Sequence, residues 1–424
     1  MPKEMLEKVQ NSGKVAVAVA VAVLVSCVTA YGQATEESYL TGMANFNRGN
    51  YDKAAESFTI AISRNNAYEN LFVRRGDCYL KLKDPESAIR DFNEANEILP
   101  NVADLWLARA YSLSDNTAKA VLFLESHLGS PYRVAEDSIK KDPAFDGLQT
   151  SQEWYMLWQK EWYSDEEKAV ADVRYYMKKG LPDQAISLLD NEIVKSPSSA
   201  GLLTMRGEVN FRKGNYAAAI ADITAALTLQ KNSTRTKPSP QAGAEAGIVL
   251  RAASYLKATR YKDAVSDFTK VLKDDPANFP AYLQRAQANA GLQNWEAAIR
   301  DVQTYLRYFN DDAGAVFQCG TYYFDSEDYM NALKCFNKNL KQDPNNSNYY
   351  KARGMTYTKT ATYRYAVSDL SMALDLDPDD AETWMYLGVA KIRTGDNVNG
   401  CSDLEKARQM GSTEAVKYML ENCK

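Results

Sequence analysis

Small and apolar residues recur along this chain at a fixed distance of 34 residues, with charged and polar residues between them. The first period contains Gly42, Gly49, Tyr51, Ala54, Phe58 and Ala61, and the next continues it with Gly76, Tyr79, Ala88, Phe92, Ala95 and Pro100. The same skeleton returns with Gly207, Gly214, Tyr216, Ala219 and Ala226, then runs through Ala264, Ala298, Ala332 and Ala366 to Gly400. A period between about 20 and 50 residues predicts stacked structural units rather than one compact core.

Each period predicts two antiparallel helices that cross closely at a small residue. The eighth position is Gly or Ala in eight units, namely Gly42, Gly76, Gly207, Ala252, Ala286, Gly320, Gly354 and Gly388. A residue without a large side chain lets the first helix approach the second. Pro then ends several units, as at Pro276, Pro344 and Pro378, because it cannot continue a helix.

This period and this skeleton resemble those of the tetratricopeptide-repeat family, in the form found in exported bacterial proteins. The resemblance implies an all-α fold, a superhelix (α-solenoid) of about nine to ten helix-turn-helix units closed by a C-terminal capping helix. The predicted organisation, in residue numbers, is 35–130, an N-terminal sub-array; 131–165, an irregular helical connector; 166–230, further repeats; 231–247, a flexible insertion; 248–412, a C-terminal sub-array; and 413–424, the capping helix.

Residues 1–34 have a different composition and predict a secretion signal. Lys3, Lys8 and Lys14 precede an apolar run over 15–28 that is too short to span a membrane comfortably. The sequence leaves two ways of processing this segment open. Gly32-Gln33-Ala34 suits cleavage by signal peptidase, whereas Leu24-Val25-Ser26-Cys27 resembles a lipobox in which Cys27 would be lipidated. Either way of processing predicts an exported protein, periplasmic or associated with the outer membrane.

In five units an Arg at the seventh position is matched by an Asp sixteen residues later. The pairs are Arg75 with Asp91, Arg206 with Asp222, Arg251 with Asp267, Arg285 with Asp301, and Arg353 with Asp369. We expect each pair to face across its hairpin as an ion pair worth about 0 to 1 kcal/mol if it is exposed. In the unit that starts near Ala313 the same two positions hold Cys319 and Cys335.

Facing cysteines in an exported protein predict a disulfide between Cys319 and Cys335, with two buried free thiols as the alternative. Cys401 and Cys423 are candidates for a second disulfide that would hold the C-terminal cap, and Cys78 would stay unpaired.

Trp154, Trp158 and Trp162 in the connector follow one another at helical spacing. They form either a platform for a ligand or part of the core between the two sub-arrays. Core packing is favoured, because large aromatic residues are mostly buried.

Composition and motifs argue against catalysis and against several ligand classes. The net charge is −5, and no Lys and Arg cluster is interleaved with aromatic residues, so nucleic acid is not an expected partner. His127 is the single histidine, and no phosphate loop, nucleophile elbow or metal-ligand cluster is present. The carboxylate pairs at 274–275, 311–312 and 379–380 fit helix-end turns. We therefore expect a protein without enzymatic activity, cofactor or metal.

The family resemblance implies that a partner protein or peptide binds along the concave face formed by first helices. The best-known family variant clamps a carboxylate terminus with Lys and Asn at positions five and nine. This chain has Tyr39 and Met43, Thr204 and Glu208, Phe317 and Thr321, or Lys351 and Met355 at those positions, so that clamp is not expected.

The inner face offers aromatic, amide and hydroxyl groups instead. The candidate partner-binding residues are Gln287, Phe317 and Thr321, with Lys351 as an isolated charge. The predicted function is a protein-interaction scaffold of the bacterial cell envelope. A module that binds glycan or peptidoglycan-associated ligands is the alternative, since aromatic grooves can stack sugars.

Overall fold

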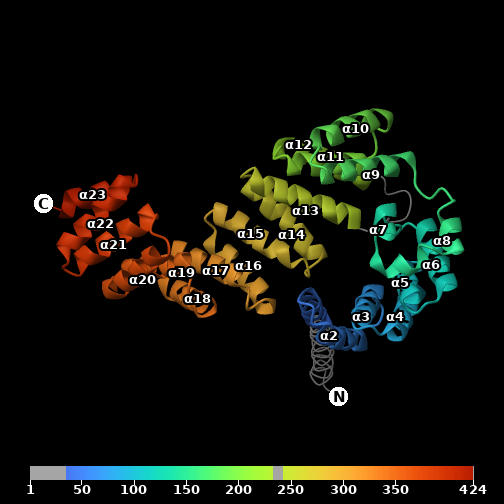
Figure 1. Cartoon of the computed structure of the whole chain (residues 1–424), viewed down its shortest axis with the longest axis horizontal. Coiled ribbons are helices and arrows are strands. Elements are labelled where there is room, and N and C mark those ends of the chain that lie inside the picture. Colours follow the sequence, from blue (N-terminus) through green and yellow to red (C-terminus); the bar gives the residue numbers. More distant parts are fainter. Residues whose placement is uncertain (1–34, 233–241, 424) are drawn as a thin grey trace, which may run out of the picture. The chain divides into compact units, whose positions relative to one another are not determined.

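A computed structural model describes residues 35–232 and 242–423, which fold as consecutive α-helices without strands in that part of the chain (Figure 1). The chain divides into two compact units, Met1–Gly247 and Ile248–Lys424. No helix of the described residues is both long enough and apolar enough to cross a membrane.

In the first unit a helix over 35–47 precedes α2 (Tyr51–Arg64), α3 (Glu69–Lys81), α4 (Pro85–Ile98), α5 (Asp104–Leu113), α6 (Thr117–Gly129), α7 (Glu136–Lys140), the 3₁₀ helix η1 (Pro143–Leu148), α8 (Gln152–Leu157), α9 (Asp165–Lys178), α10 (Pro182–Lys195), α11 (Ala200–Arg212) and α12 (Tyr216–Asn232). Helix α13 (Ala242–Lys257) crosses the division between the units. The second unit continues with α14 (Tyr261–Asp274), α15 (Phe279–Gly291), α16 (Trp295–Tyr308), α17 (Ala313–Asp325), α18 (Tyr329–Gln342), α19 (Ser347–Lys359), α20 (Tyr363–Leu376), α21 (Ala381–Arg393), α22 (Asn397–Gln409) and α23 (Thr413–Asn422).

The predicted close crossing at the eighth position is confirmed. A Cβ added to Gly76 would lie 2.5 Å from the ring of Phe92, and one added to Gly354 would lie 2.7 Å from Cγ of Leu370. Both distances are shorter than carbon atoms tolerate, so only glycine allows the two helices of these hairpins to pack this closely. The partner lies sixteen residues after the glycine in both cases, as the repeat predicts.

All five predicted Arg–Asp pairs form, and they are better buried than expected. Each is bidentate; in the α19–α20 hairpin, Nε of Arg353 donates to Oδ2 of Asp369 at 2.6 Å and Nη2 donates to Oδ1 at 2.8 Å. The other four hairpins repeat this fork at distances of 2.6–3.0 Å. The aspartate side chains keep only 3–10% of their exposure. The value for an exposed pair therefore does not apply to these sites, because the carboxylates lie between the helices.

Four of these arginines also tie their hairpin to the preceding one. Nη1 of Arg353 donates to Oδ1 of Asn337 in α18 at 2.6 Å, and Nη1 of Arg206 donates to Oδ1 of Asp190 in α10 at 2.6 Å. In each case the acceptor lies sixteen residues before the arginine. One guanidinium thus joins three successive helices, which fixes how neighbouring units stack.

The connector is folded against the N-terminal sub-array. Phe145, Trp154 and Leu157 pack with Leu124 and Leu128 of α6 in one buried cluster. The prediction of core packing is confirmed, but two details differ. Helix α8 ends at Leu157, so the three tryptophans do not share one helix, and all residues of the cluster lie between 105 and 163 rather than between the two sub-arrays.

The predicted insertion over 231–247 is shorter than expected. Helix α12 continues to Asn232 and α13 already begins at Ala242. Residues 242–247 contain three Ala, the best helix former, alongside two Gly, and the structure places them in the helix. The remaining residues, 233–241, lie outside the described part of the chain, as do the signal segment 1–34 and Cys27.

Candidate partner-binding groove

The four residues predicted to bind a partner lie in the second unit, on first helices. Gln287 of α15 is exposed. Phe317 of α17 packs against Phe336 and Tyr349, and Oγ1 of Thr321 donates to the carbonyl of Phe317 within the same helix. The ring of Phe317 is thus already packed against other aromatic rings, and the hydroxyl of Thr321 already donates a hydrogen bond within its own helix.

Lys351 of α19 is not the isolated charge that was expected. Its Nζ lies 2.8 Å from Oδ2 of Asp380 and 2.8 Å from Oε2 of Glu382, which belong to the beginning of the next first helix. Burial lowers the pKa of this ammonium group, but the two carboxylates outweigh burial and raise it. Lys351 therefore links two repeats rather than standing free for a partner.

A groove formed by two adjoining pockets lies in the first unit, along the first helices α9 and α11. The larger pocket has a volume of about 630 Å³ and the smaller about 350 Å³, and both are bordered by Arg174, Met205 and Glu208. We call this surface the α9–α11 groove. Thr204 and Glu208, which the repeat register places on the inner face, both line it.

The two helices of the groove are joined at the end where they begin. Ser199 caps α11 by accepting from the backbone N–H of Leu202 at 3.1 Å, and its hydroxyl donates to Oε1 of Glu166 at the start of α9. A Cβ added to Gly201 would lie 3.1 Å from the same carboxylate oxygen. A side chain at position 201 would press on Glu166 and narrow the larger pocket.

An ion pair from the connector closes one wall of the larger pocket. Arg133 forks onto Glu167, with Nε to Oε1 at 3.0 Å and Nη2 to Oε2 at 2.9 Å. Glu167 also accepts from the backbone N–H of Ser164 at 2.8 Å, which completes a capping box at the start of α9. Burial would raise the pKa of Glu167, but the hydrogen bonds from Arg133 and Ser164 lower it.

The connector segment at this wall is held on both sides of Val134. The backbone N–H of Val134 donates to Nε2 of His127 at 3.1 Å, and the hydroxyl of Tyr163 donates to the carbonyl of Val134 at 2.8 Å. His127 is 2% exposed, and burial lowers its pKa to about 4. Burial raises the pKa of Tyr163. The imidazole is thus a neutral hydrogen-bond acceptor, and its position fixes one wall of the groove.

The repeat pattern does not predict the residues of this wall. Arg133, Val134 and Tyr163 belong to the connector, which does not follow the 34-residue period. The sequence signal that points to a partner such as Arg133 is the capping sequence Ser164-Asp165-Glu166-Glu167. Its second glutamate, Glu167, pairs with Arg133 from outside the helix.

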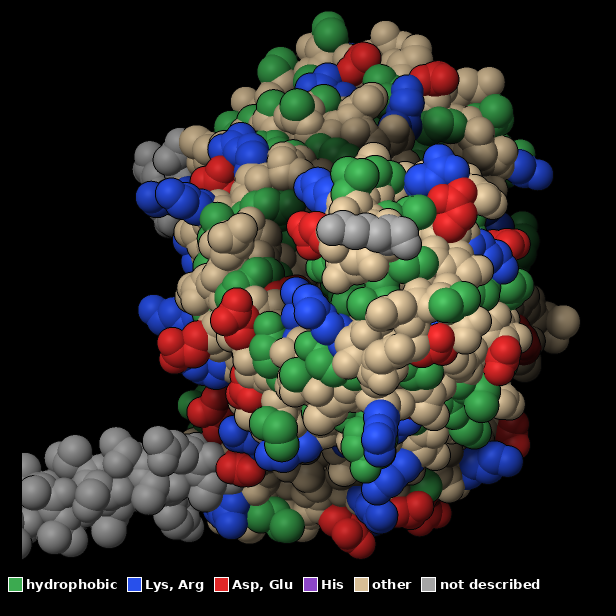
Figure 2. Space-filling view, turned by 90° about the vertical axis from the view of Figure 1, so that its left-hand side faces the viewer, with side chains coloured by type: hydrophobic (Ala, Val, Ile, Leu, Met, Phe, Trp, Pro, Cys, Tyr) green, Lys and Arg blue, Asp and Glu red, His purple; other side chains and the backbone are tan. Residues whose placement is uncertain are grey.

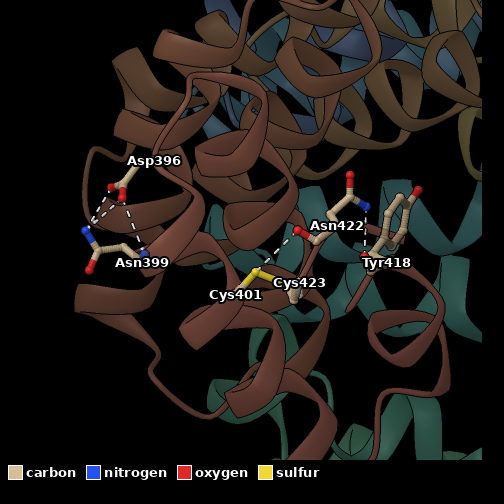
Figure 3. The surroundings of a disulfide bond; sticks show 6 residues. All are labelled: Asp396, Asn399, Cys401, Tyr418, Asn422 and Cys423. Carbon is tan, nitrogen blue, oxygen red and sulfur yellow. Dashed lines mark hydrogen bonds between the residues drawn. A yellow bond between two sulfur atoms is a disulfide. The ribbon is translucent and has the colours of Figure 1, made fainter. Parts of the chain in front are cut away.

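The cysteines behave differently at the two candidate sites. A disulfide joins Cys401 of α22 to Cys423 at the end of α23, with the Cα atoms 5.7 Å apart (Figure 3). Beside it, the side-chain amide of Asn422 donates to the carbonyl of Tyr418 at 2.8 Å. This covalent bond fastens the final helix to the last complete hairpin.

Cys319 and Cys335 are free thiols, so the disulfide predicted between them is absent from the structure. The two side chains lie close enough to shift each other's pKa: the neighbouring thiol raises the pKa of Cys319 and lowers that of Cys335. The alternative of two buried free thiols holds in part, because both thiols are free but only Cys319 is buried. Cys78 is buried and free, as expected.

The paired carboxylates that could have suggested acid–base chemistry have structural roles at helix ends. Asp312 and Asp380 cap the starts of α17 and α21 by accepting backbone N–H groups, and Asp275 follows the end of α14 and accepts from Ala277 at 2.9 Å. Within the described ranges, no group of three or more His, Cys, Asp and Glu residues is placed to hold a metal ion.

The charges on the surface are mixed in sign. On the side of the molecule toward α21–α23, Lys and Arg side chains alternate with Asp and Glu side chains and with hydrophobic ones (Figure 2). This face shows no broad patch of one charge, in keeping with the modest net charge of −5.

Comparison with known proteins identifies the repeat. The family model described as tetratricopeptide repeat matches residues 39–103, 171–234 and 249–313. The human mitochondrial import receptor subunit TOM70 is 21% identical over 375 residues, which cover 81% of this chain and 58% of that protein. The Xenopus laevis ER membrane protein complex subunit 2-A is 25% identical over 163 residues, covering 38% of this chain and 55% of that protein. The chain thus spans somewhat more than half the length of these relatives.

Among solved structures, a tetratricopeptide repeat protein from Parabacteroides merdae is 21% identical and covers 60% of this chain and 97% of its own, with a TM-score of 0.43. The matched segments of the family model include α11, the part of α9 from residue 171 onward, and the Arg–Asp pairs of Arg75, Arg206, Arg251 and Arg285. The described part of the chain is therefore all-α, and three segments of it match the model of the tetratricopeptide repeat.

Proposed function

We propose that this protein is a non-enzymatic scaffold that holds a segment of a partner protein in the α9–α11 groove. The groove itself carries the proposal, because it lies along consecutive first helices and combines an apolar floor with a polar rim, as binding sites generally do. Two of the similar proteins are named as a receptor subunit and as a subunit of a membrane protein complex, which supports an interaction role.

We further propose that the scaffold works in the cell envelope, in the periplasm or at the outer membrane. The signal-like segment 1–34 motivates this location, and Cys27 provides a possible lipid tether. The Cys401–Cys423 disulfide supports it, because such bonds persist mainly in oxidising compartments. Fractionation of cells that express the wild-type chain and Cys27→Ser tests both the location and the tether.

Site-specific photo-crosslinking tests the interaction role. A photoreactive amino acid replaces Thr204, which lines the groove, and in a matched control it replaces Ser187, which is exposed on the second helix α10. The proposal expects adducts with one defined protein segment from Thr204 but not from Ser187. Equal crosslinking from both positions, or adducts with glycan alone, would overturn it, and the latter would favour the glycan-binding alternative.

A further inference from the structure

The smaller pocket of the α9–α11 groove has an apolar floor. Met177, Met205 and Val209 line it, and Val209 is fully buried while Met205 is 8% exposed. Methionine side chains are flexible and polarisable, so they adapt to apolar groups of different shapes. A volume of about 350 Å³ is enough to receive one or two apolar side chains of a partner.

The rim of this pocket carries an excess of positive charge. Arg174, Lys178 and Arg212 line it together with a single carboxylate, Glu208. Glu208 is already paired, since its Oε1 lies 2.6 Å from Nη2 of Arg212. Among the described residues neither Arg174 nor Lys178 has an acidic partner within 4.0 Å.

Neighbouring cations, by contrast, do have acidic partners. Lys213 pairs with Asp183, and Arg206 is held by Asp190 and Asp222. Of the three cations around the smaller pocket, Arg212 of α11 is paired with Glu208, whereas Arg174 and Lys178, both on α9, border the apolar cavity without a carboxylate.

We propose that the smaller pocket binds a segment of a partner protein in which an apolar side chain lies next to Asp or Glu. The apolar group would lie on Met177, Met205 and Val209, and the acidic side chain would contact Arg174 and Lys178. Charge complementarity selects this occupant, because a basic segment would meet two unpaired cations. This inference rests on the proposed function and specifies the chemistry of the partner.

A peptide selection with the full-length protein tests the chemistry. A phage library of random peptides is selected on the wild-type chain. Enriched peptides are then synthesised with acetylated and amidated ends, which removes any contribution from a terminal carboxylate. We expect Asp or Glu next to Leu, Met or Phe, and an affinity that falls about tenfold or more for the Arg174→Glu/Lys178→Glu variant and with added salt.

Lys195→Glu is the matched control, because Lys195 is exposed at the end of α10 and away from the groove. It should leave the affinity unchanged. Arg174→Gln/Lys178→Gln removes the charges without reversing them, and thermal unfolding of each variant shows whether the repeats remain folded.

The outcomes separate this inference from the proposed function. Enriched peptides that lack acidic residues but still compete with crosslinking at Thr204 would overturn the acidic partner while leaving the groove as an interaction site. A selection that enriches no peptide would overturn the inference as well. If Thr204 gives no specific crosslink in the envelope, the proposed function fails, whatever the peptides show.

Discussion

Two neighbouring hairpins of the second unit fill the same pair of facing positions in opposite ways. In α19–α20 the positions hold Arg353 and Asp369, an ionised and bidentate pair. In α17–α18 they hold Cys319 and Cys335, two free thiols. Both hairpins retain a glycine at the next position, Gly320 or Gly354, against which a large apolar side chain packs.

The difference shows that these two facing positions can hold either an ionised pair or two neutral thiols. Removing one partner of a buried pair leaves the other without compensation, whereas replacing both can cost little. This is the physical reason why both members change together in the cysteine hairpin. Links between repeats change as well, because the position that an acceptor for Arg would occupy holds Gln303, which donates to the hydroxyl of Tyr323 at 2.5 Å.

The largest effect is expected when one half of an ionised pair is removed. Arg353→Met leaves the carboxylate of Asp369, whose side chain is 8% exposed, without its partner. We expect the α19–α20 hairpin to lose about 3 kcal/mol of free energy of opening. Native-state hydrogen exchange measures this locally, which matters because long repeat arrays need not unfold in two states.

Two controls make this test specific. Arg300→Met breaks an exposed i,i+4 pair with Glu296 and should cost no more than about 0.5 kcal/mol. The double variant Arg353→Met/Asp369→Leu removes both charges and should recover most of the loss. Equal losses for Arg353→Met and Arg300→Met would show that burial of the carboxylate is unimportant.

A second test compares these ionised pairs with a hydrogen bond that depends on a neutral imidazole, that of His127. His127 accepts the backbone N–H of Val134, and its pKa of about 4 lies below the ordinary value near 6.5. The unfolded chain therefore binds a proton more readily between these values, so this contribution to stability is complete above about pH 6.5 and is lost as the pH falls toward 4. We expect a loss of about 2 kcal/mol by pH 5 around α5–α8.

Because His127 is the single histidine, NMR of its imidazole reports the pKa without assignment. His127→Gln keeps an acceptor for Val134 and should remove this part of the pH dependence. A titration midpoint near 6.5 in the folded protein would contradict the prediction.

A third and smaller effect is expected when the two kinds of hairpin are exchanged. Cys319→Arg with Cys335→Asp places the common pair in the α17–α18 hairpin, and Gln303 stands where other repeats supply an acceptor for the arginine. The double variant should unfold within about 1 kcal/mol of the wild type. Cys335→Asp alone should lose more, because it buries a carboxylate without a cation. If the double variant is the worse of the two, facing positions are not interchangeable as pairs.

The contrast between hairpins also separates what the sequence predicts from what it does not. Arg353 and Asp369 were predictable because both belong to one period and their spacing recurs in four other units. The partners of Lys351 were not predictable from the repeat. Asp380 and Glu382 come from the next unit, and acidic residues do not recur at the equivalent positions of every repeat. The wall of the groove was not predictable either, since Arg133 and Val134 belong to a connector without the period.

The last test concerns the cysteines. It needs no substitution, so the stability of the protein is unchanged, and it distinguishes the thiols by their reactivity. The neighbouring thiol lowers the pKa of Cys335 and, with burial, raises that of Cys319, while burial raises the pKa of Cys78 to about 12. Only the thiolate reacts with iodoacetamide, so Cys335, which is also partly exposed, should be alkylated first at pH 8. Its rate should level off above its lowered pKa, whereas the rate of Cys78 should still rise about tenfold per pH unit at pH 9. Peptide mass spectrometry follows each site, and Cys401 and Cys423 should stay unlabelled without reductant. If Cys319 and Cys335 also resist labelling until a reductant is added, the pair is a disulfide, and the hairpin is closed by a covalent bond rather than holding two free thiols.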